Sequence, residues 1–288
     1  MAPSLSYRGP LGPTLESELE RVRKWISRLV LRLPLRLHHL RAAPVLGHTI
    51  HFLSHHLIPA NQRVWMQIEA GPAMGLWFEL NPRVGRSYLR GEAEPAVQEV
   101  LAARLRPGMV FYDLGANTGL FSLLAAKLVG SKGRIFSFEP DAEIAARLRR
   151  NVERNGFSNV TVVESGVWSS SGTVNFVPAD SSSPDRGTGR FESANDSIGV
   201  RTRCVALDDF IVEAPSPDAI KCDVEGGEVE ALKGAERLLH SCRPWILCEM
   251  HSDANDRASR NFLGRCGYRF EAVDDTHVLA LPLAMGRE

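Results

Sequence analysis

The sequence has few cysteines, no net charge and no long apolar run. Its 5 cysteines form no C-x-x-C pair and are odd in number, which argues against a disulfide framework or a structural zinc site. Because 34 Lys and Arg balance 34 Asp and Glu, the overall charge gives no reason to expect a nucleic-acid partner. No stretch reaches the ~18 apolar residues of a membrane span, and the first residues lack the pattern of a secretory signal. We therefore expect a cytoplasmic protein without a transmembrane span.

The 288 residues leave room for one large domain and a smaller N-terminal part. A helix that becomes basic along its length is predicted from Thr14 to Pro34, and short strands are predicted over residues 64–90. We accordingly predict an extension over residues 1–90 and a domain over residues 91–288. Such a basic amphipathic helix packs more often on its parent domain or a partner than on a membrane surface.

Six of the 9 histidines lie in residues 34–60. A metal site and a packed, amphipathic appendage are the two interpretations of this segment. We favour the appendage, because no Cys, Asp or Glu lies among these histidines to complete a ligand set.

From Met109 onward, short apolar runs typical of buried strands alternate with longer segments of helical spacing. This alternation predicts a mostly parallel sheet covered by helices on both faces. The predicted helices are residues 120–128, 142–155, 228–240 and 255–266. The predicted strands are residues 110–113, 134–139, 160–164, 219–223, 245–250, 268–273 and 277–281, and the last two form an antiparallel pair.

Two further strands, residues 172–177 and 200–205, are predicted on either side of a polar stretch, residues 178–199. Long polar loops often act as lids or substrate loops. A substrate loop and an insertion without function both remain open for this stretch.

Residues 113–119 read DLGANTG and join a predicted strand to a predicted helix. Glycines allow a tight turn and the close approach of a ligand, and a helix start presents free N–H groups. The pattern D-x-G-x-x-x-G differs from the G-x-G-x-x-G that meets a pyrophosphate. A strand-end acid suits a cationic ligand instead, such as S-adenosylmethionine (SAM), which carries a sulfonium and an ammonium and no phosphate. The stretch resembles motif I of class I SAM-dependent methyltransferases.

The ends of the next two strands supply further candidate residues, because ligands of doubly wound sheets bind beyond the carboxyl ends of the strands. Glu139, followed by Pro140, ends the second strand, where a carboxylate can accept from ribose hydroxyls. Gly166 and Val167 follow the third strand, and there we expect a backbone contact with the adenine. Glu164 is a weaker candidate for that contact.

Residues 221–228 (KCDVEGGE) and 249–251 (EMH) place several charged groups at the ends of the fourth and fifth strands. Such a cluster is too costly to bury without a purpose. Because side chains alternate along a strand, Lys221 and Asp223 share a face and can pair, and Glu249 and His251 can point the same way.

Together these elements resemble the FkbM family of methyltransferases over about residues 88–270. The matching motifs are D-x-G-A-N-x-G at 113–119, E-P at 139–140, the asparagines and glycine of 151–156, L-D-D at 207–209, K-x-D-V-E-G-x-E at 221–228 and E-x-H at 249–251, with the lead-in at 88–95. Cys222 and Gly227 are mild departures. The resemblance implies a class I methyltransferase fold, which is a Rossmann-like three-layer α/β/α arrangement. Its sheet is mostly parallel and seven-stranded with an antiparallel C-terminal strand, here preceded by a helical and β extension.

The resemblance also implies SAM as the methyl donor and a hydroxyl group as the acceptor. Carried onto this sequence, the expected cofactor contacts are Glu94, Asp113, Gly115, Asn117, Gly119, Glu139, Pro140, Gly166, Val167 and Asp223.

We expect an in-line displacement in which a base removes the proton of the attacking hydroxyl. His251 is the preferred base, with Glu249 as its orienting partner. Asp223 and Glu225 are rivals, since either could be the base or could bind the ammonium of SAM. A Mg²⁺ ion held by Asp223, Glu225 and Glu249 is a further alternative. We do not favour it, because acid clusters also bind cationic SAM or pair with lysine.

The sequence therefore predicts O-methylation of a hydroxyl on a sugar, a polyketide or another small molecule. The alternative is a catalytically silent, methyltransferase-like module that contacts a partner through its N-terminal extension. Neither the acceptor nor the oligomeric state follows from the sequence, because function lies in the site rather than in the fold.

Overall fold

The computed structural model describes residues 13–32, 61–178, 189–192 and 199–284. Its centre is a seven-stranded sheet in the order β12-β13-β11-β10-β3-β4-β5. Strands β5, β4, β3, β10 and β11 run parallel, and β13 runs antiparallel to both of its neighbours. The strands are β3 (Val110–Leu114), β4 (Arg134–Phe138), β5 (Val160–Val163), β10 (Ala219–Cys222), β11 (Trp245–Glu249), β12 (Tyr268–Ala272) and β13 (His277–Pro282). The predicted sheet, with its antiparallel C-terminal strand, is confirmed.

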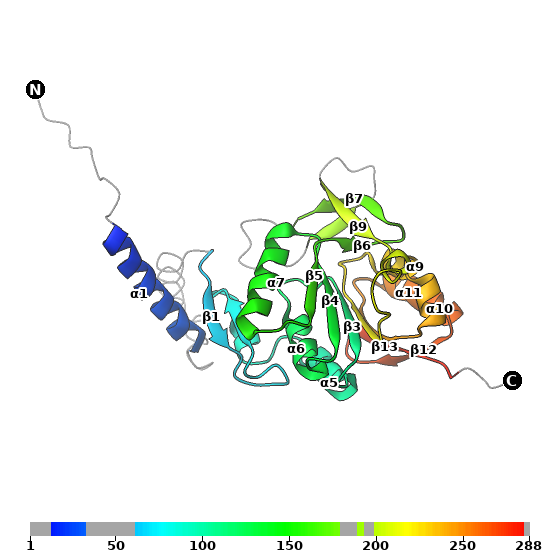
Figure 1. Ribbon diagram of the computed structural model, residues 1–288, viewed down its shortest axis with the longest axis horizontal. Helices are drawn as coiled ribbons and strands as arrows, with labels where there is room; N and C mark the ends of the chain where they lie inside the picture. The colour runs from blue at the N-terminus through cyan, green and yellow to red at the C-terminus, as the bar shows by residue number, and fades with distance from the viewer. Residues whose placement is uncertain (1–12, 33–60, 179–188, 193–198, 285–288) are drawn as a thin grey trace, which may run out of the picture.

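Helices cover both faces of this sheet (Figure 1). On one face pack α5 (Pro95–Arg104), α6 (Leu120–Val129) and α7 (Ala142–Asn155). On the other pack α8 (Leu207–Phe210), α9 (Glu228–Lys233), α10 (Glu236–Ser241) and α11 (Asp253–Arg265). Successive residues of one strand serve opposite faces, as the pleat requires: Phe111 belongs to the first core and Tyr112 to the second. The three-layer arrangement is therefore confirmed.

The single helix predicted over residues 228–240 is wrong, because the chain forms α9 and α10 with a break at Gly234. A Cβ built on Gly234 would lie 2.0 Å from the carbonyl oxygen of Trp168. The chain around Trp168 thus passes so close that only glycine fits, and this tertiary contact overrides the helical periodicity.

A second, four-stranded sheet lies beyond the carboxyl ends of the central strands (Figure 1). It consists of β6 (Gly166–Val167), β9 (Val200–Val205), β7 (Gly172–Val177) and β8 (Arg190–Glu192) in that order. The strands predicted over residues 172–177 and 200–205 are confirmed. Part of the predicted polar loop pairs with β7 as β8, while residues 179–188 and 193–198 lie outside the described residues.

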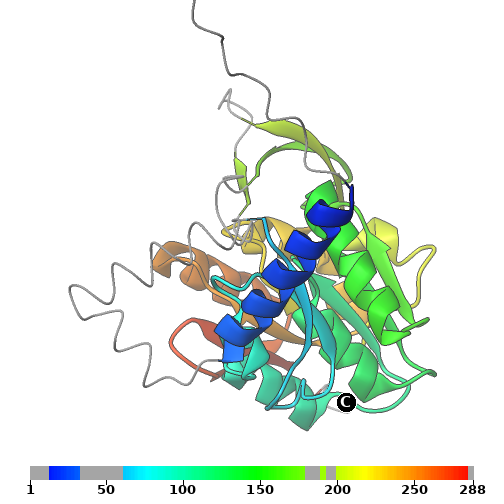
Figure 2. The same cartoon turned by 90° about the vertical axis from the view of Figure 1, so that its left-hand side faces the viewer.

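The N-terminal part contains α1 (Pro13–Arg32), a hairpin of β1 (Val64–Gln67) and β2 (Trp77–Leu80), and α4 (Arg86–Leu89). Figure 2 views the molecule from this side. The hairpin docks on α7, where Oδ1 of Asn151 accepts from the Glu79 N–H at 3.0 Å and Oδ1 of Asn155 from the Trp77 N–H at 2.8 Å. Its buried side chains join the core beside α5 and α6. The division at residue 90 stays a prediction.

Helix α1 confirms the predicted N-terminal helix, and it combines buried and exposed residues. Ser27 and Leu31 are buried, whereas Val22, Trp25 and Leu29 expose half or more of their surface. The histidine-rich segment of residues 34–60 lies outside the described residues. None of the helices in the described part of the chain has the length and apolar character needed to cross a lipid bilayer.

Candidate functional site

β4 and β5 follow β3 in the chain and lie on one side of it in the sheet, whereas β10 lies on its other side. This reversal of strand order is the topological switch point, where ligands of open α/β sheets bind. The loop after β3 is held tightly there. The N–H groups of Gly115 and Ala116 both donate to the carbonyl oxygen of Phe138, at 3.1 and 2.9 Å. The motif of residues 113–119 thus lies at the predicted place in the fold.

Both glycines of this loop have positive φ, which favours glycine. Gly115 has φ +74°, and a Cβ built on it would lie 1.7 Å from the carbonyl oxygen of Asp223. Gly119 has φ +94°, and its Cβ would lie 2.0 Å from a methyl carbon of Leu148, the end of a flexible side chain. Side chains at these positions would strain the backbone, and at Gly115 the backbone after β10 would also have to move.

Glu139 connects the end of β4 to the same loop. Its carboxylate accepts from the backbone N–H of Asn117 at 2.9 Å and from that of Asp141 at 3.0 Å. Only 7% of the residue is exposed, and burial raises the pKa of its carboxyl to about 7 despite these two donors. A buried carboxylate fixed in this way offers its remaining lone pairs to a ligand.

A pocket lies between this loop, the end of β4, the small sheet and the end of β10. Eight of the predicted site residues line it: Gly115, Asn117, Glu139, Pro140, Gly166, Val167, Asp223 and Glu225. Six lining residues were not predicted: Phe138, Asp141, Ile144, Phe176, Gly189 and Val224. The apolar members among these look like ordinary core positions in the sequence, so no signal marked them as ligand contacts.

Asp113 is not among the residues that line the pocket. It is fully buried, and its Oδ2 accepts from Oγ of Ser122 at 2.6 Å, which in turn accepts from Oγ of Ser137 at 2.7 Å. Burial raises the pKa of its carboxyl. Its neighbour in register on β10 is Lys221. The direct cofactor contacts expected of Asp113 and Gly119 stay predictions.

Lys221 and Asp223 share one face of β10, as predicted, with Nζ and Oδ2 2.8 Å apart. Lys221 is 2% exposed, and its ammonium lies 5.0 Å from the ring centre of Phe121. Burial disfavours the charge of Asp223, but the lysine outweighs this effect and holds the pKa of that carboxyl below its ordinary value. Asp223 is therefore a carboxylate at neutral pH, at the wall of the pocket.

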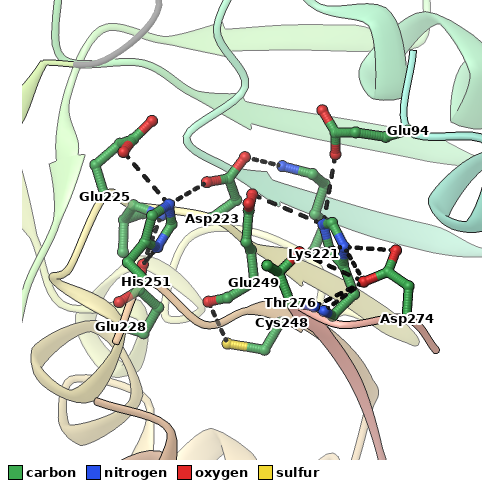
Figure 3. Close-up of polar contacts among 12 residues, drawn as sticks. Glu94, Lys221, Asp223, Glu225, Glu228, Cys248, Glu249, His251, Asp274 and Thr276 are labelled. Atoms are coloured by element: carbon green, nitrogen blue, oxygen red, sulfur yellow. Dashed lines mark hydrogen bonds and ion pairs between the residues drawn. The ribbon is translucent and has the colours of Figure 1, made fainter. Parts of the chain in front are cut away.

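His251 follows β11 and lies among three carboxylates (Figure 3). Its Nδ1 is 3.0 Å from Oε1 of the fully buried Glu228, and its Nε2 is 3.3 Å from Glu225 and 3.6 Å from Asp223. The hydrogen bond with Glu228 outweighs the opposing effect of burial and raises the pKa of His251 to about 9. The orienting partner in the structure is thus Glu228 rather than the predicted Glu249.

Glu228 can reach His251 because it begins α9 and turns back toward the end of β10. Its Oε1 also accepts from the backbone N–H groups of Val224 and Gly226, at 3.2 and 3.1 Å. Glu225, between them, has φ +52°. This tight turn after β10 brings the acids of residues 221–228 together, and it was not predicted.

Glu249, at the end of β11, faces His277 of β13, its neighbour in register. Its Oε2 lies 3.7 Å from Nε2 of His277, and Oε2 of Glu94 lies 3.5 Å from the same nitrogen. Burial, and next the charge of Asp223, raise the pKa of Glu249 to about 7. His277 was not predicted, since no motif surrounds it. Glu164, the weaker adenine candidate, forms a half-exposed ion pair with Arg149 at 3.0 Å.

Residues 113–270 match the family model described as the Methyltransferase FkbM domain. This stretch is more than half of the chain. The chain belongs to the FkbM methyltransferase family. The predicted family, which rested on the motifs between residues 113 and 251, is confirmed.

Two relatives of this FkbM-family chain are named as methyltransferases. One is named for hexuronic acid, and the other is named as a 2-O-methyltransferase. The chain is 30% identical over 172 residues to the hexuronic acid methyltransferase AglP of Haloferax volcanii, covering 59% of this chain and 66% of AglP. It is 26% identical over 191 residues to the 2-O-methyltransferase NoeI of Sinorhizobium fredii, covering 59% of this chain and 76% of NoeI. It spans less than two thirds of AglP.

Among solved structures, the chain is similar to a methyltransferase FkbM from Methylobacillus flagellatus, with 22% identity and a TM-score of 0.45. The similarity covers 62% of this chain and 44% of that one.

Proposed function

We propose that this protein transfers the methyl group of SAM to a hydroxyl oxygen of a small acceptor, with a sugar as the leading candidate. The observation that carries the proposal is the buried carboxylate of Glu139, fixed by two backbone N–H groups at the wall of a switch-point pocket. The name of AglP, a hexuronic acid methyltransferase, supports a sugar as the acceptor, and the name of NoeI, a 2-O-methyltransferase, supports transfer to oxygen. Polyketide and other small-molecule hydroxyls are tested alongside it.

The charges around the pocket fit SAM better than a phosphate-containing cofactor. Glu139 would accept hydrogen bonds from the ribose hydroxyls, as acids at the second strand end of such sheets do. Ile144, Val167 and Val224 would provide apolar contacts for the adenine. Asp223, a carboxylate held by Lys221, would face the positive end of the cofactor. The sulfonium and ammonium of SAM are attracted by these acids, whereas a pyrophosphate is repelled.

In the proposed reaction the acceptor oxygen attacks the methyl carbon of SAM as the carbon–sulfur bond breaks. S-Adenosylhomocysteine leaves, and the hydroxyl proton passes to a base on the protein. Much of the acceleration comes from holding the donor and the acceptor in line. The protein's task is therefore to position both molecules and to accept one proton.

Nε2 of His251 is the proposed proton acceptor. Glu228 accepts from Nδ1–H, which fixes the tautomer with the lone pair on Nε2, beside Asp223 and Glu225 at the pocket. With a pKa of about 9 in the protein alone, His251 is mostly protonated at neutral pH. The positive charge of bound SAM would lower this pKa and favour the neutral, basic form. Asp223 and Glu225 remain the rival bases.

The Mg²⁺ alternative rested on Asp223, Glu225 and Glu249. In the structure Asp223 and Glu225 gather around an imidazole nitrogen, and Mg²⁺ prefers oxygen ligands in an octahedral arrangement. We therefore write the reaction without Mg²⁺.

A screen of hydroxylated acceptors with methyl-labelled SAM tests the proposal. Hexuronic acids, neutral sugars and non-sugar alcohols are incubated with the full chain, and labelled product and S-adenosylhomocysteine are measured together. We expect both to appear in equal amounts with a sugar acceptor. Transfer to a non-sugar alcohol alone would refute the sugar assignment and keep the methyltransferase.

The silent module is the second candidate, and the exposed apolar side of α1 favours it. Val22, Trp25 and Leu29 are half or more exposed on this helix. If this candidate holds, SAM binds without turnover on any acceptor of the screen. The double substitution Val22→Ser and Trp25→Ser would then weaken partner binding and leave SAM affinity unchanged.

A further inference from the structure

Apart from His251 and its carboxylates, a second cluster consists of one histidine and two carboxylates: His277, Glu94 and Glu249. The reaction as proposed above assigns no step to these residues. Nε2 of His277, on β13, lies 3.5 Å from the carboxylate of Glu94 and 3.7 Å from that of Glu249. Glu94 precedes α5 and Glu249 ends β11, so three separate elements bring one atom each to a common point. These three atoms all lie within 4.8 Å of one another.

Asp274 orients the imidazole of His277 through the ring nitrogen Nδ1. Nδ1 lies 2.9 and 3.0 Å from the two oxygens of Asp274, which also accepts from the backbone N–H groups of Thr276 and His277. Burial lowers the pKa of His277, but the carboxylates of Glu94 and Asp274 outweigh this effect and raise it. A metal ion at Nε2 would therefore replace a proton there, while Asp274 accepts from Nδ1–H. Metal-binding histidines are oriented by carboxylates in the same way.

The other ring nitrogen of His277, Nε2, is buried and has no hydrogen bond to the described residues. His277 is 4% exposed, and its Nε2 finds no hydrogen-bond partner among the described residues. The two facing oxygens, at 3.5 and 3.7 Å, are too far for a charge-assisted hydrogen bond of about 2.7–2.9 Å. A buried polar atom without a partner calls for a ligand or another explanation.

The spacing matches the edges of a metal coordination shell. Zn²⁺ binds imidazole nitrogen and carboxylate oxygen at about 2.0–2.1 Å, so neighbouring ligand atoms of a tetrahedron lie about 3.3–3.4 Å apart. The two nitrogen–oxygen separations, 3.5 and 3.7 Å, are slightly longer than this value, and the third edge, between the two carboxylate oxygens, lies within 4.8 Å. Glu94 is placed for this contact by a left-handed backbone with φ +45°, which is unfavourable for a residue with a side chain and is typical of functional sites.

We propose that Oε2 of Glu94, Oε2 of Glu249 and Nε2 of His277 bind a first-row divalent metal ion, for which Zn²⁺ is the best-fitting example. Asp274 orients the histidine and does not touch the ion. One nitrogen and two carboxylate oxygens make up the three-ligand set of an open site, with the fourth position left for water or an acceptor oxygen. Only that last role, holding the acceptor, rests on the proposed function.

The test is a calorimetric titration of Zn²⁺ into the full chain after chelator treatment and removal of the chelator, without SAM or acceptor. We expect one site in the wild type and its loss in His277→Ala. The Asp274→Asn variant is expected to bind about 10–100-fold more weakly, since its side chain only orients a ligand. His251→Ala is the matched control, because His251 faces Asp223 and Glu225 in a similar arrangement. This control should keep the site.

Circular dichroism checks the fold of each variant, and Glu94→Gln replaces His277→Ala if the latter does not fold. No Zn²⁺ binding by the wild type overturns the proposal. So does binding that survives His277→Ala or that is lost in His251→Ala instead. Because neither SAM nor acceptor is present, these outcomes leave the methyltransferase proposal untouched, and failure of the acceptor screen leaves the metal site untouched.

Discussion

Glu228, which is completely buried, accepts a hydrogen bond from Nδ1 of His251 at 3.0 Å. The same Glu228 oxygen accepts from two backbone N–H groups in the turn after β10. The orientation of His251 is thus tied to the turn that carries Asp223 and Glu225. A single carboxylate sets both the tautomer and the pKa of the proposed base.

Glu228→Gln is expected to lower the pKa of His251 from about 9 toward the ordinary imidazole value. Because the folded-state pKa is raised, the stability that this pair contributes is full below pH ~6.5 and disappears as the pH rises through about 9. The variant should therefore lose more unfolding free energy at pH 6 than at pH 9.5. Urea unfolding at both values measures this. Glu230→Gln, which breaks a pair with Lys233 at the helix surface, should show no such pH dependence.

The same substitution is expected to move the pH–rate profile. If neutral His251 accepts the proton, kcat rises with pH through the pKa of His251 in the complex, and Glu228→Gln shifts this rise to lower pH. Asp223 has a pKa below its ordinary value, so a profile that is flat between pH 6 and 9 in both proteins would exclude His251 and leave a carboxylate, Asp223 or Glu225, as the base.

Glu139→Gln is expected to weaken SAM binding by at least about tenfold. The amide offers one acceptor oxygen where the carboxylate offers two, and each hydrogen bond to a charged group contributes about 1.5–3 kcal/mol. Calorimetry with SAM measures the ratio. The control is Glu69→Gln, whose carboxylate lies in an exposed ion pair with Arg32 and should leave the affinity unchanged. Equal losses in the two variants would remove Glu139 from the cofactor site.

Gly115→Ala is expected to destabilise the protein more than Gly156→Ala. Both glycines have positive φ, so both substitutions strain the backbone, by about 1–2 kcal/mol. Only Gly115 would also bring its Cβ to 1.7 Å from the carbonyl of Asp223, whereas Gly156 has no atom within 4 Å of that position. The overlap adds about 1–3 kcal/mol. The difference in unfolding free energy between the two variants measures it, and equal values would contradict the close contact.

Patterns along the chain were enough to predict the central sheet, since strand residues such as Phe111 and Tyr112 alternate between two apolar cores. The loop of Gly115 and Gly119 was also predictable, because a strand, two spaced glycines and a helix follow one another directly. These features depend on neighbours in sequence. Most of the fold can therefore be predicted from patterns among residues that are close in sequence.

The contacts that set the site depend on residues distant in sequence. Glu228 approaches His251 only because the turn after β10 folds back, and His277 meets Glu249 through the register of β13 against β11. The break between α9 and α10 results from Gly234 packing on the backbone of Trp168. No periodicity encodes these three contacts, so the site had to be read from the structure.

We expect SAM to bind in the pocket beside Glu139. A calorimetric titration of the full wild-type chain with SAM measures this binding. We expect one saturable site per chain, with S-adenosylhomocysteine competing for it. The absence of saturable SAM binding by folded protein would refute a SAM site in this pocket.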